Sequence, residues 1–577
     1  MKRYWAFTKN YRWAFLLAPL LVVLDVIAEM FSPKLMSQIV DVGIANGDMA
    51  FIIKTGIMMV GLALFAVLAN VGSVVFAARA SQGFGAQIRK ALYDKIQSFS
   101  FSEIDKFSTP SLITRLTNDV STIQQTAMMA MRMMVRAPIS FVTALIFAIS
   151  ISPKLSLIIL GIFPALVIII GVLLKLAMPL FIKMQERLDG LNLVVQENLT
   201  GVRVVKSLNR QTKEKEKFTD ANNKLMETSM KAMKLMMTAM PIVMLLFNLA
   251  VVAILWFGGQ QVSVGGLMAG ELISLTNYVT QVLMSMVMMA MTLLMYSRSR
   301  ASLRRIGEVL DTESTIADGP DSTATVTRGK VEFENVSFSY GGEEAFDALK
   351  NVSFTAQPGE TVAIVGATGS GKTSLVQLIP RLYDVSYGRV LVDDRDVREY
   401  GLDALRESIG MVLQVNTLFS GTVESNMRWG KETATITEIE QALSAAQALD
   451  FVSEMESGIQ APVEQGGVNF SGGQKQRLCI ARALVKEPKI LILDDSTSAV
   501  DTTTEGRIRR ALTEQHPDTT VILIAQRISS IRGADRILVL EDGSICASGT
   551  HDELLKESPI YQEIYQSQLE EGGDFDG

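Results

Sequence analysis

The chain has 577 residues, of which 48% are hydrophobic and only 20% are charged. A formal net charge of −6 argues against nucleic acid as a partner, because bulk attraction to phosphate needs excess positive charge. Two histidines exclude a polyhistidine metal site, and Cys479 and Cys546 lack the spacing of a disulfide framework or a zinc site.

The N-terminal residues are basic and aromatic. Residues 1–12 combine Lys and Arg with Tyr, Trp and Phe, which is typical of a helix lying in the headgroup layer of a membrane. The apolar run that follows differs from a signal peptide, because Asp25 and Glu29 interrupt it and no small-residue cleavage site comes after it. We therefore expect a retained first span.

Six stretches have the length and apolar character of membrane spans, which need about 20 helical residues. They are residues 13–39, 55–78, 137–153, 155–174, 235–258 and 272–297. Lys and Arg gather in two connections, with 11 in residues 183–234 and six in residues 79–115. The opposite loops hold only Lys154. The positive-inside rule predicts a multi-pass protein of the plasma membrane with both termini in the cytoplasm.

Helical periodicity continues through both basic connections, as in Ile88, Leu92 and Ile96. We therefore expect the membrane helices to extend far into the cytoplasm. They are expected to turn back near residues 100–107 and 208–218. The six helices and their extensions, residues 13–310, form the predicted membrane domain.

The composition changes after residue 310. Residues 311–328 are polar and rich in turn-forming residues, which predicts a linker. Short β-type runs then alternate with helical stretches over residues 329–570, which indicates an α/β domain with a largely parallel sheet. Residues 571–577 are predicted to be a disordered tail. The β-type runs are residues 331–333, 361–365, 389–392, 490–493, 521–525 and 536–540.

A phosphate-binding loop follows the second of these runs, with the sequence Gly366-Ala-Thr-Gly-Ser-Gly-Lys372-Thr373. Its glycines let backbone N–H groups surround phosphates, and the helix after it adds positive potential. Lys372 is expected to reach the β- and γ-phosphates of ATP, and Thr373 to bind Mg²⁺ together with Asp494. The predicted ATP-binding residues of this loop are Gly366, Thr368, Gly369, Ser370, Gly371, Lys372, Thr373 and Ser374.

Further motifs stand in the order of the ATP-binding cassette (ABC) family. Ser471, in Phe470-Ser-Gly-Gly-Gln474, precedes Asp494 by 23 residues, as the family's signature precedes its Mg²⁺ aspartate. Gln414 matches the family's glutamine loop, Asp501 the loop after that aspartate, and Tyr340 the aromatic residue that stacks on adenine. With its six spans, nearly the whole chain resembles an exporter half-transporter.

The resemblance implies a helical membrane domain, with six spans and long cytoplasmic extensions, fused to an α/β P-loop ATPase. Two such cassettes would close face to face, so the signature of one chain would touch the γ-phosphate held by the other. ATP and Mg²⁺ are the implied cofactors, and Gln414 is an implied metal ligand beside Thr373 and Asp494. The remaining implied ATP-binding residues are Tyr340, Ser471, Gly472, Gly473, Gln474 and Asp501.

Two residues depart from the family pattern. Asp495 stands where the catalytic glutamate is usual, and Gln526 stands where a histidine is usual. Asp495 is one methylene shorter, and misplacement by about 1 Å can cost on the order of 10²-fold in rate. Gln526 cannot ionise as histidine does. With Gln414 they are the candidate catalytic residues, and together they predict a site that binds ATP but hydrolyses it slowly.

A non-identical partner follows from this hypothesis. A homodimer would carry both departures in both sites, leaving the intact signature without a fast site to complete. The chain thus resembles the degenerate-site subunit of heterodimeric bacterial multidrug exporters, with a partner half-transporter that carries the usual Glu and His. An ordinary homodimer that tolerates the substitutions is the alternative. Alternatives of function are a lipid flippase, or an ATP-dependent sensor that does not transport.

The transported substrate is less well specified. Asp25 and Glu29 share one helix face, which fits either a patch attracting cationic amphiphiles or pairing with Arg132 and Arg136. Spans five and six are rich in methionine, which suits either an adaptable surface for hydrophobic compounds or packing against lipid. The candidate substrate-binding residues are Asp25, Glu29, Asn248, Asn277 and Gln281.

Overall fold

The computed structural model describes residues 2–319, 323–340, 347–496 and 499–571. The chain divides into two compact units. One consists of Met1–Ile96 and Pro110–Asp311, and the other of Gln97–Thr109 and Thr312–Gly577. Residues 320–322 of the expected linker and 572–577 of the expected tail lie outside the described residues.

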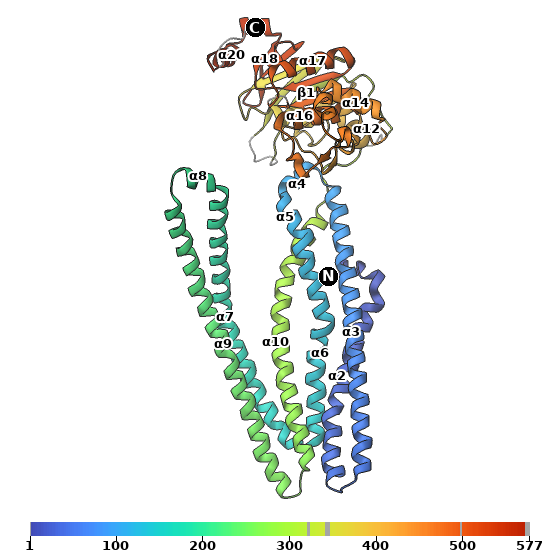
Figure 1. The fold of residues 1–577 in the computed structure, drawn as a ribbon, viewed down its shortest axis with the longest axis vertical. Helices are drawn as coiled ribbons and strands as arrows, with labels where there is room; N and C mark the ends of the chain where they lie inside the picture. The colour runs from blue at the N-terminus through green and yellow to red at the C-terminus, as the bar shows by residue number, and fades with distance from the viewer. Residues whose placement is uncertain (1, 320–322, 341–346, 497–498, 572–577) are drawn as a thin grey trace. The chain divides into compact units, whose positions relative to one another are not determined.

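The first unit is helical (Figure 1). Six of its helical stretches are long and apolar enough to cross a membrane, which confirms the predicted number of spans. Its elements are α1 (Lys2–Ala6), η1 (Lys9–Tyr11), α2 (Arg12–Gln38), η2 (Ile39–Ile44), α3 (Met49–Gln97), α5 (Thr109–Thr114), η3 (Arg115–Asp119), α6 (Val120–Ile151), α7 (Pro153–Thr200), α8 (Val202–Ser207), α9 (Gln211–Ser263) and α10 (Ala269–Asp311).

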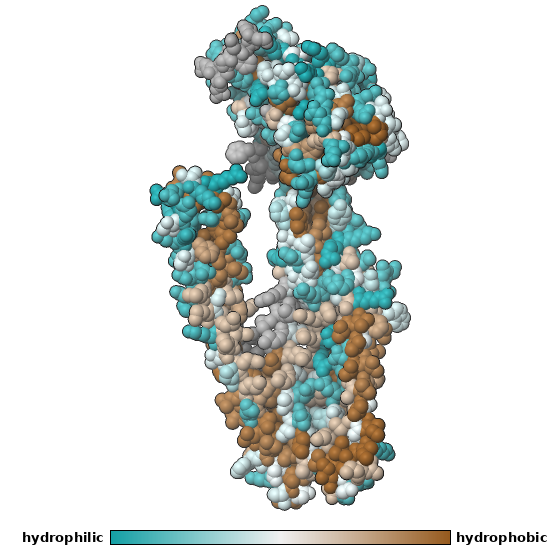
Figure 2. Space-filling model, viewed as in Figure 1, coloured by the Kyte–Doolittle hydropathy of each residue, from teal (hydrophilic) through white to brown (hydrophobic). Residues whose placement is uncertain are grey.

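Two groups of helices form this unit. Helix α6 packs against α2 and α10, and α7 runs beside α9 with α8 joining them at one end (Figure 1). Tyr278 of α10 is fully buried, and its hydroxyl donates a hydrogen bond to the carbonyl oxygen of Met30 at 2.7 Å, which ties α10 to α2. Hydrophobic side chains cover the lower halves of the helices, and hydrophilic ones surround α8 (Figure 2). Exposed apolar side chains there suit contact with lipid.

The sequence placed the first of the two predicted helix turns correctly and the second too late in the chain. Helix α3 ends at Gln97 and α4 (Phe101–Phe107) follows, as expected. The second turn lies at residues 201–210, earlier than predicted, because α7 ends before Gly201 and α8 occupies Val202–Ser207. Asn209 then reverses the chain with a positive φ of 52°.

Helix α4 belongs to the second unit. The Tyr383 hydroxyl donates a hydrogen bond to the Asp105 carboxylate at 2.6 Å, and the Thr315 N–H donates one to Glu103 at 3.2 Å. Glu103 also closes a capping box with Ser100 at the start of α4. These contacts explain why residues 97–109 group with the α/β unit and not with the long helices.

Two larger sheets organise the second unit. The six-stranded sheet has the order β12-β11-β3-β10-β9-β6, and its pairs are parallel except β11–β12, which confirms the predicted parallel sheet. Two predicted runs, 331–333 and 389–392, instead belong to an antiparallel sheet of order β2-β1-β4-β5. The strands are β1 (Val331–Phe338), β2 (Leu349–Ala356), β3 (Thr361–Gly366), β4 (Tyr387–Val392), β5 (Arg395–Asp396), β6 (Ile409–Val412), β7 (Gly421–Thr422), β8 (Pro462–Val463), β9 (Ile490–Asp494), β10 (Thr520–Ile524), β11 (Arg536–Glu541) and β12 (Ser544–Gly549).

Helices and short turns accompany these sheets. The helices are α11 (Lys372–Leu378), α12 (Leu402–Glu407), α13 (Val423–Arg428), α14 (Ile436–Ala445), α15 (Leu449–Ser453), α16 (Gly472–Leu484), α17 (Thr502–Gln515), α18 (Ile528–Ile531), α19 (His551–Glu557) and α20 (Pro559–Glu571). The sheet order matters for function, because β10 lies between β3 and β9. Neighbouring parallel strands end at the same edge, so the loops after β3, β9 and β10 meet there.

Candidate nucleotide-binding site

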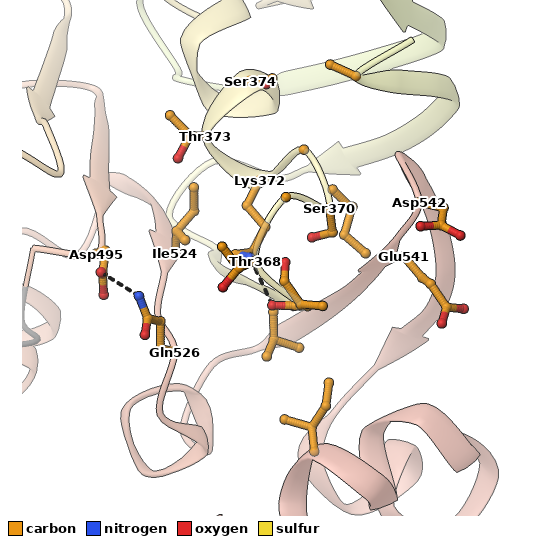
Figure 3. A pocket seen from close by; sticks show the side chains of 18 of the residues that line it. Thr368, Ser370, Lys372, Thr373, Ser374, Asp495, Ile524, Gln526, Glu541 and Asp542 are labelled. Carbon is orange, nitrogen blue, oxygen red and sulfur yellow. Dashed lines mark hydrogen bonds between the residues drawn. The ribbon is translucent and has the colours of Figure 1, made fainter. Parts of the chain in front are cut away.

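The phosphate-binding loop has a backbone that requires glycine. Gly369 and Gly371 have φ values of 88° and 97°. A Cβ on Gly371 would lie 2.4 Å from the carbonyl oxygen of Ala348, so no larger residue fits. The Lys372 ammonium group donates hydrogen bonds to the carbonyl oxygens of Gly366 and Ala367 at 2.9 and 2.8 Å (Figure 3). The lysine is thus folded back over the loop, and burial lowers the pKa of its ammonium group.

A cavity of about 940 Å³ opens over this loop. Tyr340 lines it, and this residue is 53% exposed. Phe338 and Tyr383 hold the Tyr340 ring through near-perpendicular contacts, with centroids 4.7 and 5.2 Å away. A supported and half-exposed ring suits stacking with adenine. The other predicted residues in the lining are Gly366, Thr368, Gly369, Ser370, Gly371, Lys372, Thr373, Ser374, Gln414, Asp494, Asp495 and Gln526.

Asp494 has the environment of a Mg²⁺ ligand. It ends β9 at 1% exposure, and one of its carboxylate oxygens accepts a hydrogen bond from the Thr373 hydroxyl at 3.1 Å. The other oxygen, Oδ2, is buried with no hydrogen-bond partner among the described residues. Burial also raises the pKa of this carboxyl group. A buried carboxylate oxygen beside a hydroxyl oxygen matches the oxygen ligands that Mg²⁺ prefers, so the residues present fit this ion.

Asp495 and Gln526 face each other at the carboxyl ends of β9 and β10. The Gln526 side-chain amide donates a hydrogen bond to Asp495 Oδ2 at 2.8 Å (Figure 3). The Gln414 side chain makes a second hydrogen bond to Asp495. Burial raises the pKa of Asp495, and these two amides oppose that shift. Asp495 also has a positive φ of 47°, which further fixes the direction of its side chain.

The signature residues form the start of α16. Ser471 and Gln474 form a capping box, in which the Ser471 hydroxyl accepts from the Gln474 N–H and the Gln474 side chain accepts from the Ser471 N–H. The Gln474 side chain is thus engaged in its own helix. A Cβ on Gly473 would lie 2.8 Å from the Ala499 carbonyl oxygen. Gly472 and Gly473 thus let the first turn of α16 pack closely against Ala499.

The residues predicted to bind ATP through the signature do not reach the cavity. Among the described residues that line it, none comes from 471–474, and Asp501 is absent too. Asp501 instead caps α17 by accepting a hydrogen bond from the Thr504 N–H at 2.9 Å. Within one chain, therefore, the phosphate loop and the signature form separate sites.

The charged residues of the first span pair with α6. One arm of the Arg136 guanidinium contacts Asp25, and the other contacts Glu29, each at 2.5 Å. Asn70 donates to Asp25 at 2.9 Å and accepts from Arg132 at 3.2 Å. Pairing with Arg136 is therefore confirmed, whereas Arg132 bonds Asn70 and not the two acids. One guanidinium balances only one of the two carboxylates, and the Glu29 side chain is 44% exposed, so a patch that attracts cationic amphiphiles stays a prediction.

The other candidate substrate-binding residues lie on α9 and α10. Asn248 and Asn277 are exposed, and each donates a hydrogen bond to a carbonyl oxygen four residues earlier in its own helix at 3.0 Å. Gln281 is half-buried on α10. The amides of Asn248 and Asn277 are thus bonded within their own helices, and a role of the three residues in substrate binding stays a prediction.

Comparison with known proteins agrees with this geometry. Residues 15–286 match the family described as ABC transporter transmembrane region, and residues 349–498 match that described as ABC transporter. An uncharacterized ABC transporter ATP-binding protein of Bacillus subtilis is 40% identical over 99% of each chain. The chain belongs to the ABC transporter family.

Two other relatives place this ABC transporter more closely. A fatty acid ABC transporter ATP-binding/permease protein of Mycobacterium tuberculosis is 34% identical over 83% of this chain and 75% of its own length. The structure of a bacterial Atm1-family ABC exporter with ATP bound aligns with a TM-score of 0.80 and 25% identity, covering 98% of this chain and 99% of the other. The protein is therefore an exporter half-transporter whose ATPase drives transport.

Residues that the motifs did not reveal complete the ATP cavity of this ABC transporter. They include Glu541 at the end of β11, Asp542 in the turn after it, and residues of α20. The spacing of Ile560 and Ile564 on α20 indicates an apolar helix face, but no sequence signal shows where that face docks. The α20 residues in the lining are Ile560, Glu563, Ile564, Ser567 and Gln568.

Proposed function

We propose that this chain is one half of a heterodimeric exporter that uses ATP to move hydrophobic or amphiphilic compounds, drugs among them, out across the cytoplasmic membrane. The observation that carries the proposal is the Asp495–Gln526 pair, set in a site that otherwise has every group needed to bind Mg²⁺ and ATP. This chain's own site would hold ATP and hydrolyse it slowly.

The geometry around Asp495 supports slow hydrolysis. An attacking water must be held about 3 Å from both its base and the γ-phosphate. The Asp495 carboxylate is one methylene shorter than glutamate, and two side-chain amides, from Gln526 and Gln414, occupy it. The neutral amide of Gln526 cannot take up a proton as an imidazole can.

The separation of phosphate loop and signature supports a partner. The signature of this chain keeps its glycines and its capping box, but it lies apart from the chain's own ATP cavity. It would complete the site of a second half-transporter that carries glutamate and histidine at the two altered positions. Such a pair would contain one fast site and one slow site.

Long-chain amphiphiles are the cargo that the chain supports best. The relative named a fatty acid ABC transporter handles a molecule of this kind. Helices α9 and α10 present exposed methionines, including Met237 at 70% exposure, and thioether side chains adapt to apolar ligands of different shape. Asp25 and Glu29 share Arg136, so they are less available to a cationic compound than two unpaired carboxylates would be.

The test is co-expression of this chain with candidate half-transporters encoded nearby. ATPase activity is measured in lipid nanodiscs for each pair and for this chain alone, followed by transport of a fluorescent amphiphile into inverted vesicles. The correct pair is expected to hydrolyse ATP on the order of 10²-fold faster than this chain alone, because only the pair contains an unaltered site. Rapid hydrolysis and transport by this chain paired only with itself would contradict the proposal.

A further inference from the structure

Helix α20 binds the loop that carries Gln526. The side-chain amide of Gln568 donates a hydrogen bond to the Gln526 carbonyl oxygen at 2.6 Å, and its oxygen accepts one from the Ile528 N–H at 2.8 Å. One side chain thus holds the backbone on both sides of Arg527. The loop joins β10 to α18, which begins at Ile528, and among the described residues these two groups make no hydrogen bond to another backbone group.

The support for Gln568 is firm. Tyr561, in the first turn of α20, is fully buried, and its hydroxyl lies 2.8 Å from His551 Nδ1. Gln562 donates to the Leu555 carbonyl oxygen at 2.6 Å, which fixes the start of α20 on α19. Because α20 is anchored in this way, the two hydrogen bonds of Gln568 constrain the Gln526 loop and not a mobile tail.

The two hydrogen bonds of Gln568 are linked through Gln526 to Asp495, the position of the usual catalytic glutamate. The Gln526 side chain donates to Asp495 at 2.8 Å, so Gln568, Gln526 and Asp495 form a continuous chain of hydrogen bonds from α20 to the end of β9. The same face of α20 lines the ATP cavity. A nucleotide in this cavity would therefore have α20 as one wall and the Gln526 loop beside its phosphates.

We infer that Gln568 is a positioning residue for this nucleotide site: by fixing the Gln526 loop it keeps Gln526 on Asp495 and slows the loss of bound ATP. The inference rests on the proposed function, in which this site retains ATP. It assigns α20 a role in nucleotide retention, acting through Gln526.

The chain offers matched variants for the test. Gln568→Ala removes both hydrogen bonds. Gln568→Glu keeps an acceptor for the Ile528 N–H but places a carboxylate against the Gln526 carbonyl oxygen. Gln566→Ala, on an exposed side chain of the same helix, is the control. All are made in the full-length chain in nanodiscs, together with its partner once co-expression has identified it.

One measurement tests whether Gln568 fixes the Gln526 loop, and a second tests whether it slows nucleotide release. Hydrogen exchange follows the Ile528 amide, which is expected to lose protection in Gln568→Ala and keep it in Gln568→Glu. Release of a fluorescent ATP analogue, chased with unlabelled ATP, is expected to be about three- to tenfold faster in both variants, because each loses the hydrogen bond to the Gln526 carbonyl oxygen. Gln566→Ala should match the wild type in both measurements.

A double-variant cycle identifies the route of the effect. In a Gln526→Ala background, Gln568→Ala is expected to add nothing to nucleotide release, because Gln568 acts through Gln526. Unchanged release in Gln568→Ala, or full additivity with Gln526→Ala, overturns the inference. Rapid release from the wild type would instead overturn the proposed slow site, and the Ile528 exchange would still decide whether Gln568 fixes the loop.

Discussion

At the residue scale, function depends on how a few side chains share hydrogen bonds. Asp494 keeps one buried oxygen without a hydrogen-bond partner in the described part of the chain, which leaves it available to Mg²⁺. Asp495, the next residue, is held by Gln526 and Gln414. Of these two adjacent carboxylates, one is available to the ion and the other accepts hydrogen bonds from side-chain amides. In the proposed function, the site therefore binds nucleotide but activates water poorly.

Restoring the two altered residues is the direct test of this account. Asp495→Glu combined with Gln526→His is expected to raise hydrolysis at this site by up to about 10²-fold, because the longer carboxylate reaches the water and the imidazole can ionise. ATPase activity is measured in a heterodimer whose partner has its catalytic glutamate replaced by glutamine, so that only this site contributes. The single variants serve as controls and should gain less. No gain in the double variant means that the defect lies elsewhere.

Sequence motifs identified these residues but not their bonds. The phosphate loop, Asp494 and Tyr340 all line the cavity as predicted, because strand order brings the loops after β3, β9 and β10 together. Gln474 and Asp501, by contrast, cap helices within the chain. A motif gives residue type and order, whereas hydrogen-bond partners depend on local backbone geometry that spacing does not encode.

At the element scale, the membrane unit depends on a charged contact between α2 and α6. The i,i+4 spacing placed Asp25 and Glu29 on one face, but it did not show which arginine would pair with them. In the structure, Arg136 contacts both, and Asp25 is buried. An ionised group in the hydrocarbon region needs a partner of opposite charge, so this contact fixes the register of the two helices.

Removal of Arg136 should therefore destabilise the first unit. Arg136→Gln leaves Asp25 buried with only Asn70 as a partner, and an unpaired buried charge costs about 3 kcal/mol. Denaturant-induced unfolding in detergent micelles measures the loss. Arg304→Gln is the control, because the Arg304 side chain on α10 is 81% exposed and its ion pair contributes little. Equal stability of Arg136→Gln and the wild type would show that the network is not structural.

The sequence predicted the main elements but not all the contacts between them. The six spans and the parallel sheet follow from hydropathy and β-type runs, and both are confirmed. The attachment of α4 to the cassette unit depends on single contacts, such as Tyr383 with Asp105, between residues 278 positions apart. No periodicity encodes such a pairing, and the same is true of the docking of α20.

At the scale of the whole molecule, the phosphate loop and the signature of this cassette belong to different ATP sites in the proposed heterodimer. The phosphate loop would serve the slow site, while the signature at the start of α16 would serve the partner's fast site. Because the cavity lining includes the first and excludes the second, a variant in either region should affect a different site. Activity in the assembled pair is therefore expected to be unequally sensitive to the two regions.

Substitution at Gly473 tests this asymmetry. Gly473→Ala brings a Cβ within 2.8 Å of the Ala499 carbonyl oxygen and must shift the start of α16, so total ATPase activity of the heterodimer is expected to fall on the order of 10²-fold. Gly506→Ala on α17, where an added Cβ meets nothing within 4 Å, is the control and should leave activity unchanged. Lys372→Ala weakens ATP binding only at the slow site and should cost less than Gly473→Ala. If Lys372→Ala reduced activity as much, both sites would contribute equally, and the signature of this chain would have no special role in fast hydrolysis.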